Sequence, residues 1–325
     1  MGIFSRRRKG RSRRIFFASD LHGSEQCFKK LVNAGKHYGA HAVICGGDLT
    51  GKMIVPLVED EDGSVRASFL GQEVVCSTAE EVTALDKRLT AAGYYPYRTD
   101  EASVSDLDDA GIERLFADVI TERLRGWVAI AEDRIADSDI EFFWMAGNDD
   151  HEIVDDVLRG SERLIFSDGR RVPILEGWEM VTLGLSNPTP WGCPRDVPEE
   201  EIARRIDELM AGVSEPSRCI LNIHVPPQGT RLDQAPELDA ELRPRLDAGG
   251  LRLANVGSTA VREALERYRP ALSLHGHIHE SAGVDKLWNT VCVNPGSDYQ
   301  EGVLRGALVV LNDEGGVKDW ALTTG

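Results

Sequence analysis

The sequence predicts an α/β protein, a sandwich of two β-sheets covered by helices, with one inserted, cap-like segment. Three observations lead to this prediction. Short apolar runs alternate with helical patterns near the start of the chain, later apolar runs are separated by short turns, and residues 51–138 break the alternation. Alternating strands and helices are typical of a parallel sheet, whereas strands joined by short turns favour antiparallel pairing.

The first predicted unit covers residues 14–48. Residues 14–18 and 42–45 are short apolar runs, and residues 24–38 between them carry apolar side chains at helical spacing. Parallel strands need a crossover of this kind, because the chain must return to the same end of the sheet. We therefore expect a β-α-β unit with its helix lying across the sheet.

The segment at 51–138 is expected to be an insertion that caps the main domain, which spans residues 15–325. Its expected elements are a hairpin (54–58 with 65–75), two helices (78–92 and 106–135) and an aromatic loop between the helices (93–97). The core then resumes, and its late strands suggest a second, partly antiparallel sheet. We expect strands at 141–146, 178–185, 218–223, 271–274, 288–293 and 306–312, and helices at 198–211 and 258–268.

Charge is distributed unevenly along the chain. The formal net charge is -17, yet seven arginine and lysine residues lie within the first fourteen positions, so the remainder is more acidic still. A strongly acidic body repels nucleic acid, and we do not expect a nucleic-acid partner. Residues 1–14 are interpreted as a disordered basic arm, with contact to nucleic acid or anionic lipid as the alternative.

Other features bear on the compartment. No run of about 18 uncharged apolar residues occurs, so no membrane-spanning helix is predicted. The basic start lacks the apolar core of a signal peptide. The 6 cysteines form no Cys-x-x-Cys pair, and several lie within predicted strands, as the reduced thiols of a cytoplasmic protein do. We therefore expect a cytoplasmic protein.

Five predicted strands end in side chains that can bind metal ions. In open α/β sheets, ligands bind at the carboxyl ends of the strands, so these side chains are expected to converge although they are far apart in the sequence. In strand order they are Asp20 and His22, then Asp48, then Asn148, then His224, and finally His277 and His279.

The types of these seven residues indicate the kind of metal site. Imidazole, carboxylate and amide oxygen suit borderline divalent cations such as Mn, Fe, Zn, Ni or Co. The set contains no thiolate, which disfavours a structural zinc site. Seven ligands are too many for one tetrahedral ion and suit two ions that share one carboxylate. Such a pair acidifies a bound water and neutralises phosphoryl oxygens.

The ordered motif blocks resemble the calcineurin-like metallophosphoesterase superfamily, in its small bacterial and archaeal phosphoesterase branch. The resemblance spans residues 15–312 apart from the insertion. It implies the two-sheet sandwich of the metallo-dependent phosphatases and assigns Asp20, His22 and His279 to one metal, Asn148, His224 and His277 to the other, and Asp48 to the bridge. The blocks are Asp20-x-His22, Gly46-Gly47-Asp48, Gly147-Asn148-Asp149, His224 and Gly276-His277-x-His279.

One position departs from the pattern of the superfamily. A histidine that protonates the leaving oxygen usually follows the metal-binding asparagine, and here Asp149 holds that place. Asp149 could act as the acid, His151 could reach the substrate instead, or the leaving group could need no acid. General acid catalysis typically contributes ~10²–10⁴-fold. We therefore expect activity on aryl phosphates to survive better than activity on alkyl phosphates.

The resemblance implies a metal-dependent hydrolase that cleaves a phosphomonoester or phosphodiester of a small molecule. Two other functions stay open: a non-catalytic protein-interaction module with the same fold, and a nuclease, which only the basic arm favours. The sequence alone does not distinguish monoester from diester, name the metals or give the oligomeric state.

Overall fold

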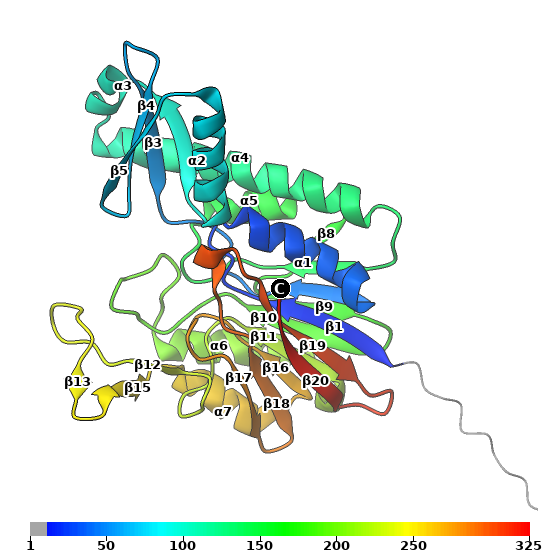
Figure 1. The fold of residues 1–325 in the computed structure, drawn as a ribbon. Coiled ribbons are helices and arrows are strands. Elements are labelled where there is room, and N and C mark those ends of the chain that lie inside the picture. Colours follow the sequence, from blue (N-terminus) through cyan, green and yellow to red (C-terminus); the bar gives the residue numbers. More distant parts are fainter. Residues whose placement is uncertain (1–11) are drawn as a thin grey trace, which may run out of the picture.

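The computed structural model describes residues 12–325. Of the predicted basic arm at 1–14, residues 1–11 therefore lie outside the described residues. The described chain is built around two six-stranded sheets with helices on their outer faces (Figure 1). This arrangement confirms the predicted two-sheet α/β sandwich. Arg13 and Arg14, which the prediction counted with the arm, already belong to the first strand.

The first sheet contains the β-α-β unit predicted near the start of the chain. Strand β1 (Arg13–Ala18) pairs in parallel with β2 (Ala42–Cys45), and helix α1 (Glu25–Tyr38) connects them. Ser24 caps α1 by accepting the Cys27 backbone N–H, and Gly39 ends it in the left-handed conformation. The sheet order is β20-β19-β1-β2-β7-β8, which adds β7 (Glu141–Trp144), β8 (Leu164–Phe166), β19 (Arg305–Leu311) and β20 (Val317–Thr324).

The second sheet is partly antiparallel, as predicted. Its four central strands run parallel to one another, and each edge strand pairs antiparallel with its neighbour. The order is β17-β18-β16-β11-β10-β9, formed by β9 (Arg170–Ile174), β10 (Trp178–Leu183), β11 (Cys219–Ile223), β16 (Leu272–Leu274), β17 (Gly283–Leu287) and β18 (Thr290–Asn294).

Apolar side chains pack on both faces of each sheet. Along β1, Ile15 and Phe17 belong to the core between the sheets, whereas Phe16 packs under the helices, because successive side chains of a strand point to opposite faces. On that outer face α1 lies against α4 (Asp109–Ile135), where Phe28 and Trp127 stack with ring centroids 4.2 Å apart. Helices α6 (Glu199–Met210) and α7 (Thr259–Tyr268) cover the second sheet.

The chain between β2 and β7 forms a separate four-stranded sheet, at the top of the molecule in Figure 1. This sheet has its own small apolar core, which includes Leu57, Leu85 and Leu89. Helix α4 follows in sequence but packs against α1. The elements before α4 are β3 (Ile54–Glu59), β4 (Val65–Phe69), β5 (Gln72–Cys76), α2 (Ala79–Ala91), β6 (Tyr95–Thr99) and α3 (Glu101–Ser105).

Two expectations for this segment are only partly confirmed, although the predicted hairpin is present as the antiparallel pair β3 and β4. Residues 65–75 are two strands, because Leu70 and Gly71 have positive φ angles of 50° and 72° and reverse the chain. Of residues 93–97, only 93 and 94 are a loop, since β6 begins at Tyr95 and pairs in parallel with β3. The Tyr95 ring is buried and its hydroxyl accepts the Gly51 N–H at 2.8 Å, so this aromatic residue serves packing.

The remaining elements lie outside the two large sheets. None of the helices in the described part of the chain has the length and apolar character needed to cross a bilayer. Residues 234–255 form an arm that projects beside α6 and α7 in Figure 1. The additional elements are α5 (Ile153–Arg159), the short 3-10 helices at Pro216–Arg218 and Tyr299–Glu301, and the arm strands β12 (Gln234–Pro236), β13 (Leu246–Asp247), β14 (Gly250–Leu251) and β15 (Leu253–Asn255).

Candidate metal centre

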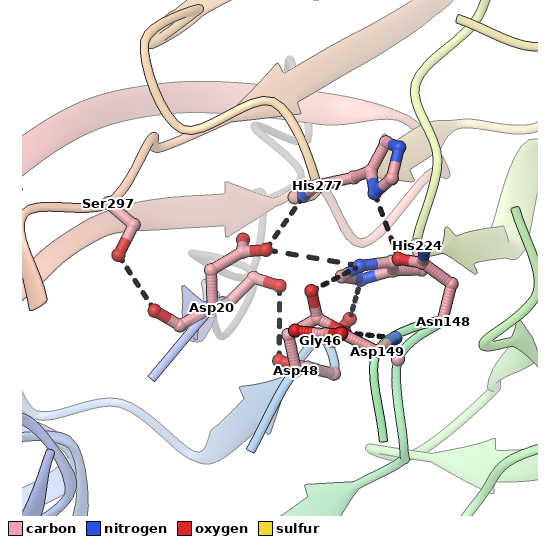
Figure 2. Close-up of polar contacts among 12 residues, drawn as sticks. Asp20, Gly46, Asp48, Asn148, Asp149, His224, His277 and Ser297 are labelled. Atoms are coloured by element: carbon pink, nitrogen blue, oxygen red, sulfur yellow. Dashed lines mark hydrogen bonds and ion pairs between the residues drawn. The ribbon is translucent and has the colours of Figure 1, made fainter. Parts of the chain in front are cut away.

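The carboxyl ends of the parallel strands in both sheets meet at one place. Asp20 follows β1, Asp48 follows β2 and Asn148 follows β7, while His224 and His277 follow β11 and β16 of the other sheet. Figure 2 shows these five side chains pointing toward one another. His22 and His279 join them, and Asn148 contacts His277, so the structure brings together all seven residues that the sequence singled out.

Four of these residues form a first group. Asp20, His22, Asp48 and His279 each offer one atom, and these atoms all lie within 4.8 Å of one another. His22 Nε2 lies 3.1 Å from His279 Nε2 and 3.6 Å from Asp48 Oδ2, and His279 Nε2 lies 3.4 Å from Asp20 Oδ1. Such a cluster could hold a metal ion.

A second group shares one member with the first. Asp48, His224 and His277 also place one atom each within 4.8 Å of one another, and His224 Nε2 lies 3.3 Å from Asp48 Oδ2. The amide oxygen of Asn148 lies 2.9 Å from His277 Nδ1, which adds a neutral oxygen donor. Because Asp48 belongs to both groups, its carboxylate occupies the position of a bridge.

Several potential ligand atoms at the centre form no hydrogen bond within the described protein. Asp20 Oδ2, His22 Nδ1 and His224 Nε2 are buried and form no hydrogen bond. A buried polar atom without a partner costs ~1–3 kcal/mol, and native proteins rarely leave such atoms unsatisfied. Three such buried atoms lie beside the carboxylate that both groups share. This arrangement is satisfied better by bound cations than by a closed network of hydrogen bonds.

The protonation states suit cation binding. Burial lowers the pKa of His22 and of His277 to about 4, so both imidazoles are neutral and keep a lone pair. Burial of Asp20 would raise its pKa, but the hydrogen bond and charge of His279 outweigh it and hold the pKa at about 2. Burial likewise opposes ionisation of Asp48, yet the His224 charge holds the Asp48 pKa well below its usual range.

His224 behaves differently from the other two buried imidazoles. Burial would lower its pKa, but the carboxylates of Asp48 and Asp20 raise it to about 10. Its Nδ1 lies 2.8 Å from the Gly46 carbonyl, which leaves Nε2 directed toward Asp48. A cation between Nε2 and the carboxylates would take the place of the proton that this ring otherwise carries.

The backbone at the centre is strained. Asp20, His22, Asp48 and His277 have φ angles of 59°, 42°, 50° and 68°, in the left-handed region that side chains other than glycine rarely adopt. Strain of this kind persists where the surrounding structure holds it, and it clusters at functional sites. A Cβ added at Gly147 would collide with the Asp48 carboxylate, which explains the glycine next to Asn148.

Two carboxylates outside the predicted set hold the centre in place. Asp196 Oδ1 accepts the Asn148 side-chain N–H at 2.8 Å, which turns the Asn148 amide oxygen toward His277. Asp150 is buried and accepts the backbone N–H groups of Thr50 at 2.9 Å and Gly147 at 2.8 Å, so it ties the loop after β2 to the loop after β7. Burial and the Asp48 charge raise the Asp150 pKa to about 6, while these donors oppose the shift.

Asp149 lies at the centre, but His151 does not. Asp149 Oδ2 lies 3.7 Å from His22 Nδ1 and 2.5 Å from the ammonium of Lys52, a residue that sequence reasoning missed. His151 is exposed and does not line the cavity at the centre, and its ring faces Phe116 with centroids 6.4 Å apart. The structure therefore brings only Asp149 together with the seven candidate ligands.

A cavity of about 750 Å³ opens directly onto the centre. His22, Asp48, Asn148, His277 and His279 form its floor. Its other walls come from the loop at 187–193 and from the base of the arm at 234–256. A small molecule could thus reach the candidate metal ligands.

Comparisons with known proteins give a relative and a shared fold. No family model matches the sequence. Over 180 residues the chain is 31% identical to the uncharacterized protein MJ1162 of Methanocaldococcus jannaschii, covering 54% of this chain and 74% of that protein. TT1561 of Thermus thermophilus superposes with a TM-score of 0.52 at 13% identity, over 97% of this chain and 98% of its own. A dimetal phosphatase from Danio rerio aligns over 96% of this chain and 98% of its own, at 9% identity and a TM-score of 0.45.

Proposed function

This chain belongs to the same family as MJ1162 and has the calcineurin-like metallophosphoesterase fold, and from its site we propose that it is a metal-dependent hydrolase of small phosphate esters. One observation carries the proposal. Two groups of potential ligands share Asp48, and three of their buried atoms, Asp20 Oδ2, His22 Nδ1 and His224 Nε2, form no hydrogen bond within the described protein. An arrangement with a shared carboxylate suits a pair of cations.

We assign Asp20, His22 and His279 to one cation, Asn148, His224 and His277 to the other, and Asp48 to both. When bound, such a pair supplies an acidified water as nucleophile and positive charge beside the phosphoryl oxygens. The donor set suits Mn, Fe, Zn, Ni or Co, and manganese is our choice for a first assay.

Lys52 adds a cation from the protein itself. Its Nζ lies 2.5 Å from Asp149 Oδ2, at the edge of the cavity. Partial burial would lower the pKa of Lys52, but the hydrogen bond and charge of Asp149 raise it. An ammonium with a raised pKa keeps its proton, so it is a weak acid catalyst and a good partner for a phosphoryl oxygen.

We therefore assign phosphate binding to Lys52 and the positioning of its ammonium to Asp149. Position 149 then provides no proton for the leaving group, and His151 is not our choice because it is exposed and does not line the cavity. This assignment predicts rates that fall steeply as the pKa of the leaving alcohol rises. Equal rates on aryl and alkyl phosphates would contradict it.

The site argues against the two other functions. A non-catalytic module has no need for buried imidazole nitrogens without hydrogen bonds beside ionised carboxylates, and all seven candidate ligands are present here. A nuclease needs cations along its substrate groove. Within residues 12–325, Lys52 is the one lysine or arginine that lines the cavity.

Hydrolysis of p-nitrophenyl phosphate and bis-p-nitrophenyl phosphate tests the proposal. Purified protein is assayed with Mn²⁺, with chelator, and as Asp48→Asn. We expect metal-dependent turnover that the substitution abolishes, and the ratio of the two rates separates monoesterase from diesterase. Absence of turnover with every divalent metal tried, in protein that binds the metal, would overturn the proposal.

A further inference from the structure

The cavity has a second half that the metal centre does not use. Away from the candidate ligands its lining is mainly apolar, and it contains a tryptophan on the loop between β10 and α6. The apolar lining residues are Pro188, Pro190, Trp191, Ala235, Pro236, Leu238, Ala254, Val256 and Ile278.

Trp191 is the largest side chain of this wall and most of it is uncovered. Its exposed fraction is 68%, although soluble proteins usually bury most of an indole ring. A large aromatic side chain left open in the wall of a cavity gains packing energy only when something else lies against it. An exposed tryptophan beside a reactive centre therefore points to an apolar group of the ligand.

The loop that carries Trp191 is tied to the candidate metal centre. Asp196 Oδ2 accepts the backbone N–H groups of Thr189 at 2.9 Å and Cys193 at 3.0 Å, on either side of the tryptophan. Asp196 Oδ1 holds Asn148. One carboxylate thus fixes both a candidate metal ligand and the aromatic wall, so the two parts of the cavity keep a defined spacing.

Charge in the apolar half excludes an anionic group there. Within the described residues, its lining carries the carboxylates Glu237 and Glu280 and no lysine or arginine. Arg245 and Arg252 reach Glu237 at 3.0 Å and 2.6 Å, so that carboxylate is already paired. A second phosphate or a polyanion would meet two carboxylates and no lysine or arginine in this part of the lining, whereas an uncharged group is not repelled.

We propose that the substrate is a phosphate ester of an uncharged alcohol whose organic group is aromatic, and that this group packs on Trp191 while the phosphoryl group lies at the metal centre. The inference rests on the proposed function and adds a substrate class to it. Trp191 is then a specificity-determining residue, with Pro236 and Val256 completing the apolar pocket.

Esters of primary alcohols test this proposal without a large change of leaving group. Benzyl phosphate and ethyl phosphate are compared in Mn²⁺-loaded protein as wild type, Trp191→Ala, Trp191→Phe and Trp320→Ala. Trp320 is the matched control, because it is also exposed, at 47%, and does not line the cavity. We expect wild type and Trp320→Ala to prefer the benzyl ester about tenfold in kcat/KM, Trp191→Phe to retain most of this preference, and Trp191→Ala to lose it.

A binding measurement separates this proposal from the proposed function. Calorimetric titration with benzylphosphonate, which is not hydrolysed, should give an affinity about tenfold weaker in Trp191→Ala than in wild type or Trp320→Ala. If no ester is hydrolysed but this difference appears, the proposed function fails and the aromatic subsite stands. If hydrolysis occurs and Trp191→Ala keeps both the benzyl preference and the affinity, the aromatic subsite is wrong and the hydrolase stands.

Discussion

Replacing Asp196 with alanine should weaken one metal site and spare the other. Asp196 Oδ1 accepts the Asn148 side-chain N–H at 2.8 Å, and without it the amide of Asn148 is free to turn its oxygen away from His277. The hydrogen bonds that Asp196 accepts come from Asn148, Thr189 and Cys193, and none comes from the first group of ligands within the described residues. The effect should therefore be confined to the cation assigned to Asn148, His224 and His277.

The structure allows the size of the effect to be worked out. Loss of a side chain that orients a metal ligand typically costs ~10–100-fold in metal affinity, and we expect this range for the Asn148 site. Asp196 also accepts three hydrogen bonds from Thr189 and Cys193. Because water can replace several of these bonds in a half-exposed loop, we expect the free energy of unfolding to fall by about 2 kcal/mol.

Competition titration of Mn²⁺ against a chromophoric chelator measures the two affinities, and urea denaturation of metal-free protein measures stability. Asp239→Ala is the matched control, because Asp239 is also a loop carboxylate that accepts two backbone N–H groups, at 3.0 Å and 2.9 Å, away from the cavity. The reasoning is refuted if Asp196→Ala leaves both Mn²⁺ affinities unchanged or weakens both equally.

Three further predictions address cation binding, phosphate binding and packing. Chelation should lower the free energy of unfolding of wild type by about 2.7 kcal/mol, relative to protein at a metal concentration of 100 times the Kd. It should lower the free energy of unfolding of Asp48→Asn much less. Equal shifts of the two proteins in thermal denaturation would contradict this prediction. Lys52→Gln should raise KM for p-nitrophenyl phosphate about tenfold in steady-state kinetics. Lys87→Gln is the control and should leave KM unchanged, because Lys87 does not line the cavity. Trp127→Ala should lower the free energy of unfolding by about 3–5 kcal/mol in urea denaturation, because this ring is buried and stacks on Phe28. A decrease below about 1 kcal/mol would refute the packing of α4 on α1.

The convergence of the candidate ligands could be predicted because parallel strands impose it. Asp20, Asp48 and Asn148 each follow a strand of one parallel set, and His224 and His277 follow strands of another. Strand ends that lie side by side in a sheet bring their next residues together regardless of their separation in the sequence. Apolar runs and the residues after them were therefore enough to locate the centre.

The supporting residues could not be predicted in this way. Asp196 reaches Asn148 from an irregular loop, and Lys52 reaches Asp149 from the end of the loop between β2 and β3. No periodic pattern fixes the position of a loop side chain, and isolated aspartates and lysines are ordinary surface residues. Asp150 could not be predicted either, because it lies outside the motif positions, although its buried carboxylate accepts hydrogen bonds from both loops.

The segment between β2 and β7 was predicted least well, for a related reason. Its strand β6 contains three polar or proline positions, and the parallel pairing of this strand with β3 depends on a partner about forty residues earlier. The predicted insertion at 51–138, with its cap-like role, remains a prediction, and no residue of its four-stranded sheet lines the cavity at the metal centre.

Metal content after loading and gel filtration tests the central proposal most directly. Mass spectrometry of the eluted protein should find two Mn²⁺ per chain in wild type and one per chain in both His279→Ala and His224→Ala, because each histidine belongs to a different group. Wild-type protein that retains no metal, or substitutions that leave the metal content unchanged, would contradict the assignment of a two-cation centre to these residues.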